Sequence, residues 1–188
     1  MEKMPLQCGR MAAVAAEYCA FIDSFSGWGH GETQCVNWLL QLEKLLPRLH
    51  VAVIALIEPT ENGQHYRFHD DDQRCELFLR LNAVLQADRK LWASYETSGE
   101  RQQSPQALCE RMADDLSDMY FDLKHGLELV DENPAHAASD WQRSFYAHWG
   151  KHLLAAECWL HAVDAGGEPP NLPEWHWPHK SNYAFSRA

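Results

Sequence analysis

The chain has 188 residues, of which 46% are hydrophobic and 8 are tryptophan. This length suits one globular domain with a sizeable core and is short for two. The formal net charge is −11, which argues against nucleic-acid binding, because neutralising phosphates requires clustered lysine and arginine. The same charge permits an acidic surface to meet a basic protein partner, although it more simply keeps the protein soluble.

Apolar residues recur at steps of three and four through most of the chain, which predicts helices rather than strands. A first helix is expected over about residues 8–25. A second is expected from Thr33 to about residue 56, with Pro47 either kinking it or starting a new helix. A polar connection over 58–72 precedes a third helix, whose apolar stripe starts at Cys75 and which ends near Tyr95.

Two helix-start signals follow, Ser104-Pro105 and Asn133-Pro134, in which a capping residue precedes proline. They predict helices over 105–130 and 135–163, and the short loop between them predicts antiparallel packing. The expected fold is all-α, a single-domain antiparallel helical bundle of about five to six helices over residues 1–167. Residues 168–188 are expected to form an extended aromatic C-terminal tail that packs on the bundle or on a neighbour.

Targeting signals are weak in this sequence. The N-terminus makes a poor signal peptide, and no apolar run approaches the ~20 residues that a membrane span requires. The six cysteines are far apart and form no Cys-x-x-Cys pair, so a zinc ribbon or a thioredoxin motif is not expected. A bacterial cytoplasm is the expected compartment, with no membrane partner.

Ionisable residues accompany the apolar stripes of the last two predicted helices. Antiparallel packing puts His148 level with residue 117 and His152 level with residue 113. At ~100° per residue both histidines are centred on the apolar face of their helix. Asp115, Asp118 and Asp122 form a file along one flank of the facing stripe, so we expect Asp115 or Asp118 to reach an imidazole.

This arrangement has two interpretations. The first is a buried His–Asp hydrogen-bond network, because a buried imidazole needs partners for its ring nitrogens. The second is a divalent-metal site in which His148 and His152, at i and i+4, bind one ion with Asp115 or Asp118 as third ligand. The Glu-x-x-His and His-Glu-x-x-His signatures are absent from the predicted helices, so no cofactor is expected and a metal is the alternative.

No catalytic motif accompanies these residues. The sequence contains no serine elbow, P-loop or dinucleotide fingerprint, which makes an enzyme the less favoured class. A second pair, His65 and His69, falls in the polar connection, where we expect a solvated loop. The favoured function is a non-enzymatic, acidic interaction domain that binds another, basic protein, for example as an immunity or antitoxin-type inhibitor. The candidate partner-binding residues are Asp70, Asp71, Asp72, Asp115, Asp118 and Asp122.

Three segments resemble a bacterial helical family, the domain of unknown function 5063. They are Leu45-Leu46-Pro47-Arg48-Leu49-His50 with the later Glu58-Pro59 step, the run from Asp114 to Lys124, and Phe145-x-x-His148-Trp149-Gly150. The resemblance covers roughly residues 10–163 and leaves out the aromatic tail. It implies an all-helical domain and supplies no activity, because the family is uncharacterised.

The sequence departs from the family pattern at two positions. Met119 stands where the family has isoleucine, which is a harmless exchange. His152 stands where the family often has a longer polar residue, which weakens the case for a histidine-pair metal site shared across the family.

Overall fold

The computed structural model describes residues 6–24, 32–56, 71–86 and 105–164. Throughout these ranges the chain is helical and contains no strand, which confirms the all-α prediction. The elements are α1 (Leu6–Asp23), α2 (Glu32–Ile54), α3 (Asp71–Leu85), α5 (Pro105–Val130), α6 (Pro134–Ser144), the π-helical turn η2 (Phe145–Trp149) and α7 (Gly150–Asp164). The aromatic tail predicted at residues 168–188 lies outside the described residues.

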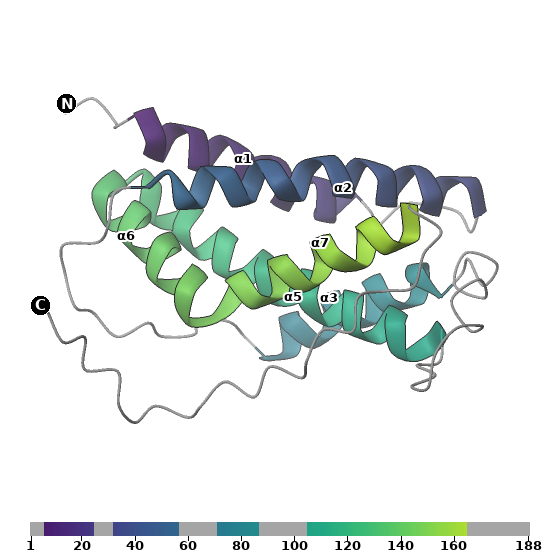
Figure 1. The fold of residues 1–188 in the computed structure, drawn as a ribbon. Coiled ribbons are helices and arrows are strands. Elements are labelled where there is room, and N and C mark those ends of the chain that lie inside the picture. The colour runs from purple at the N-terminus through teal and green to yellow at the C-terminus, as the bar shows by residue number, and fades with distance from the viewer. Residues whose placement is uncertain (1–5, 25–31, 57–70, 87–104, 165–188) are drawn as a thin grey trace, which may run out of the picture.

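Helix α5 is the centre of the bundle. It contacts α1, α3, α6 and α7, while α2 packs against α1 and α7 (Figure 1). The core contains leucines of α2, α3, α5 and α7 and the fully buried indoles of Trp38, Trp141 and Trp149. A buried hydrogen bond from the Tyr18 hydroxyl to the Leu116 carbonyl, 2.8 Å long, joins α1 to α5 inside this core.

The turn between α5 and α6 follows the predicted start signal. The Asn133 side chain accepts a hydrogen bond from the His136 N–H at 3.1 Å, and Pro134 opens the helix. Close packing of the two helices depends on Gly126, because a Cβ there would lie 2.0 Å from the Trp141 indole nitrogen. That nitrogen donates to the Leu123 carbonyl at 3.1 Å, so Trp141 is fixed against α5.

Helix α2 continues through Pro47, whose ring is on the exposed side of the helix, so the proline does not start a new helix there. The bounds of the third helix differ from expectation. Helix α3 starts at Asp71 rather than near Cys75, since Asp71 and Asp72 occupy its first turn, where the helix dipole favours acidic residues. The stretch that we predicted to end near Tyr95 is described as helix only to Leu85.

The last predicted helix is not uniform. Between α6 and α7 the chain makes one π-helical turn, closed by a hydrogen bond from the Gly150 N–H to the Phe145 carbonyl. A π-turn adds one residue to the helix and rotates everything after it relative to the residues before it. His148 and Trp149 in this turn, and His152 and Leu153 just after it, are all buried. We had expected a continuous α-helix here.

None of the helices in the described ranges combines the length and the apolar character needed to cross a membrane.

Candidate metal centre

The packing of α5 against η2 and α7 buries a cluster of ionisable side chains, called here the Asp–His cluster. On α5, Asp115, Asp118 and Asp122 follow one another at steps of three and four, so they lie on one face of the helix. His148 comes from η2 and His152 from the first turn of α7. The cluster consists of Arg74, Asp114, Asp115, Asp118, Asp122, His148 and His152.

Each histidine is oriented by its own carboxylate. His148 Nδ1 lies 2.5 Å from Asp122 Oδ2, and His152 Nδ1 lies 2.7 Å from Asp115 Oδ1. With both Nδ1 atoms occupied, the Nε2 atoms of the two rings point to a common neighbour. Metal-binding histidines in proteins have this arrangement, in which a carboxylate fixes the tautomer and leaves the other nitrogen for the ion.

That common neighbour is Asp118. Its Oδ2 atom lies 3.5 Å from His148 Nε2 and 3.1 Å from His152 Nε2. His152 Nε2 is buried, and its contact with Asp118 Oδ2 is an ion pair rather than an aligned hydrogen bond. One donor atom from each of Asp118, His148 and His152 lies within 4.8 Å of the others. We call these three residues the donor triad.

Arg74 closes the cluster from α3. Its Nε atom donates to Asp118 Oδ1 at 2.5 Å, and its Nη2 donates to Asp114 Oδ1. The guanidinium therefore occupies one oxygen of Asp118 and leaves the other facing the histidines. Asp114 is half exposed, so the Arg74–Asp114 pair forms the outer edge of the cluster and Asp118 its interior.

The pKa values reflect this packing. Burial alone would lower the pKa of His152, but the Asp115 and Asp118 carboxylates outweigh it and raise that pKa to about 9. Burial alone would raise the pKa of Asp118, yet its close contacts with both histidine rings and with the Arg74 guanidinium hold that pKa well below its usual range. Burial raises the pKa of Asp115, which the hydrogen bond to His152 opposes only in part.

The structure brings the predicted histidines and aspartates together. His148 contacts Asp118 and Asp122, and His152 contacts Asp115 and Asp118, all within about one and a half helical turns of the expected levels. It also separates the residues proposed for partner binding. Asp115 and Asp118 are buried and Asp122 is engaged with His148, so these three point into the bundle and away from a docking protein.

The remaining candidates lie elsewhere. Asp71 and Asp72 are exposed at the start of α3. Asp70, His65 and His69 lie outside the described residues. Sequence reasoning missed Arg74, because only tertiary packing of α3 on α5 brings it to the cluster. It also missed the π-turn, although Gly150 in the middle of a helical pattern was a local signal.

Comparisons with known proteins found a similar solved structure and a matching family. The crystal structure of protein BF1032 from Bacteroides fragilis is similar, with a TM-score of 0.61 at 20% sequence identity, covering 84% of this chain and 92% of that one. At this identity the likeness concerns the fold alone. No curated protein matches the chain. The family model described as a domain of unknown function, DUF5063, matches residues 3–166. The chain therefore belongs to the DUF5063 family.

Proposed function

We propose that the chain binds one divalent transition-metal ion at the donor triad of Asp118, His148 and His152. The observation that carries this proposal is the spacing of the donor atoms. Two ligands bound at about 2.0 Å with tetrahedral angles are roughly 3.3 Å apart. The separations of Asp118 Oδ2 from the two Nε2 atoms, 3.5 Å and 3.1 Å, bracket that value.

The chemistry of the donors selects the class of ion. Two imidazole nitrogens and one carboxylate oxygen suit Zn²⁺, Fe²⁺ and their first-row neighbours, whereas Ca²⁺ and Mg²⁺ prefer sites made of oxygen. Asp115 and Asp122 hold the rings from behind, and Arg74 holds Asp118 from the side. The ion would therefore meet ligands that are already oriented, with Asp118 binding through one oxygen.

Elemental analysis of protein purified without a histidine tag tests the proposal. We expect about one equivalent of a transition metal, or one equivalent taken up from added Zn²⁺, and its loss in His148→Ala and His152→Ala. His136→Ala is the matched control, because His136 is exposed on α6 and lies outside the cluster. Less than a tenth of an equivalent, or content unchanged in the two cluster variants, would leave the cluster as a purely structural hydrogen-bond network.

A second candidate is an interaction protein that binds a basic partner, as an immunity or antitoxin-type inhibitor does. It is favoured by the net charge of −11 and by the exposed Asp71 and Asp72 at the start of α3. Such a complex should weaken with salt and with Asp71→Lys/Asp72→Lys. Glu132→Lys, in the exposed α5–α6 turn, is the control. Affinity purification from the native host that recovers no stoichiometric protein would exclude this candidate.

A further inference from the structure

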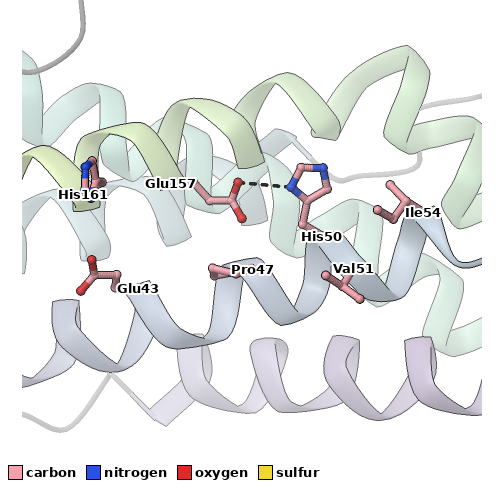
Figure 2. A pocket seen from close by; sticks show the side chains of 7 residues that line it. All are labelled: Glu43, Pro47, His50, Val51, Ile54, Glu157 and His161. Atoms are coloured by element: carbon pink, nitrogen blue, oxygen red, sulfur yellow. Dashed lines mark hydrogen bonds and ion pairs between the residues drawn. The ribbon is translucent and has the colours of Figure 1, made fainter.

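A groove of about 500 Å³ lies between α2 and α7. Glu43, Pro47, Val51 and Ile54 line it from α2, and Glu157 and His161 line it from α7 (Figure 2). His50 and Glu157 meet across the groove, with His50 Nδ1 3.3 Å from Glu157 Oε2. We call this feature the α2–α7 groove. It is separate from the Asp–His cluster, which lies between α5 and the last helices.

The α2 wall of this groove is an exposed apolar stripe. Pro47, Val51 and Ile54 occupy positions i, i+4 and i+7, so they form one face over two helical turns. Val51 is 64% exposed and Ile54 is 54% exposed, which is high for large aliphatic side chains. On α7, Leu154, about one turn before Glu157, is 47% exposed. Clustered exposed apolar side chains of this kind mark interaction surfaces.

Acidic groups flank the apolar stripe. Glu43 and Glu157 are carboxylates, and the lining includes no lysine or arginine. Glu157 Oε1 is buried without a hydrogen-bond partner, while its other oxygen contacts His50. Pro47 also lacks the N–H that would normally bond to the Glu43 carbonyl, which adds an acceptor on the same face of α2. The groove therefore combines the apolar stripe of α2 with hydrogen-bond acceptors at Glu43 and Glu157.

From these features we infer that the α2–α7 groove is the docking surface for an amphipathic helix of a partner protein with basic residues beside its apolar face. Two turns of apolar stripe match the i, i+4, i+7 anchors of a helix bound in a groove. Lysine or arginine next to those anchors complements Glu43 and Glu157. A second copy of this chain fits poorly, because a two-fold interface would set these carboxylates against their own copies on chains of charge −11.

This inference rests on the interaction candidate and does not depend on the metal centre. The interaction candidate and the groove inference can be contradicted independently of each other. A native complex that is lost in Asp71→Lys/Asp72→Lys but kept in Val51→Ser/Ile54→Ser would place the partner away from the groove. That result would overturn the inference and leave the interaction candidate intact.

A designed peptide tests the groove directly on the full chain. The probe is a 16-residue capped helical peptide with leucines at steps of three and four and flanking lysines, compared with the same peptide carrying glutamates. In amide NMR spectra of the labelled protein, the lysine peptide should shift signals from residues 43–54 and 154–161. Its affinity should exceed that of the glutamate peptide at least tenfold.

Variants make the test specific. Val51→Ser/Ile54→Ser should weaken the lysine peptide at least tenfold. Leu79→Ser is the matched control, because Leu79 is 58% exposed on α3, away from the groove, and should change nothing. Equal binding of the two peptides, or shifts that map elsewhere, would overturn the inference. So would sedimentation showing a dimer that Val51→Ser/Ile54→Ser dissociates, because a second copy would then occupy the groove.

Discussion

The N–H of Gly150 donates to the carbonyl oxygen of Phe145, and a side chain at Gly150 would collide with that oxygen. A Cβ built there lies 2.5 Å from it and 3.0 Å from the Phe145 ring. The glycine thus permits the π-turn, which contains His148 and leads directly into the first turn of α7, where His152 lies. The contact between Phe145 and Gly150 therefore spans the position of His148 and lies two residues before His152.

Gly150→Ala should destabilise the protein and weaken metal uptake. Overpacking costs roughly 1–3 kcal/mol, and the better helix propensity of alanine returns up to about 1 kcal/mol. We expect a net loss of about 1–2 kcal/mol in the free energy of unfolding, measured by urea denaturation. Lys151→Ala, at the exposed neighbouring position, should change stability little. A Gly150→Ala protein as stable as the parent would contradict the role assigned to this contact.

Zn²⁺ should raise the free energy of unfolding, because the donor triad joins α5 to the last two helical segments only in the folded chain. At a free-ion concentration 100 times the dissociation constant, the gain is about 2.7 kcal/mol. Urea denaturation with buffered Zn²⁺ and with chelator measures it. Asp118→Asn should abolish most of the gain, whereas His136→Ala should keep it. A gain that persists in Asp118→Asn would place the ion elsewhere.

Stability of the metal-free protein should fall as the pH rises from about 6.5 to about 9. The folded pKa of His152 is raised to about 9, so its protonated ring stabilises the fold below about pH 6.5. This contribution disappears as the ring deprotonates. At about 1.4 kcal/mol for each pKa unit, the change is on the order of 3 kcal/mol at most.

Urea denaturation in chelator at pH 6 and pH 9.5 measures this change. The same comparison in His152→Gln isolates the contribution of this ring from that of other titrating groups. The variant should show a clearly smaller pH dependence. Parallel curves for the two proteins would mean that His152 is not the group responsible.

Arg74→Met should cost more than the same substitution at Arg48. Arg74 bonds to the buried Asp118, whereas Arg48 forms its bidentate pair with Glu17 at the surface, at 2.7 Å for each bond. Losing the partner of a buried carboxylate costs roughly 1–3 kcal/mol, and losing an exposed ion pair costs at most about 1 kcal/mol.

Arg74→Met should also lower metal affinity about 10- to 100-fold, as removal of groups that orient ligands generally does. Titration with Co²⁺ measures the affinity, and its visible spectrum reports the coordination geometry. Arg48→Met should leave both unchanged. Equal effects of the two substitutions on metal affinity would mean that Arg74 does not orient a metal ligand.

The sequence predicted the local parts of this structure well, because helix periodicity and capping depend on neighbouring residues. Asn133-Pro134 marked the start of α6. The short turn before it predicted that α5 packs antiparallel to the last helices. Antiparallel register then placed His148 and His152 beside Asp115 and Asp118, which the structure brings together.

What escaped prediction depends on contacts between distant segments. Nothing near Arg74 in the sequence points to Asp118, 44 residues away, because the pairing exists only once α3 packs on α5. For the same reason the sequence did not show that Asp118 is buried, so Asp118 was included among the predicted partner-binding residues. The apolar periodicity of the last predicted helix fits a continuous α-helix, so it did not reveal the π-turn between α6 and α7.

Apart from Arg74, the Asp–His cluster is local in the chain. Its histidine–carboxylate hydrogen bonds join residues 26 and 37 positions apart, all within α5, η2 and α7. Contacts of short sequence separation close small loops and form early in folding. The C-terminal hairpin is thus able to assemble its ionisable centre before α1, α2 and α3 dock, and an ion bound at that stage would act as a folding nucleus.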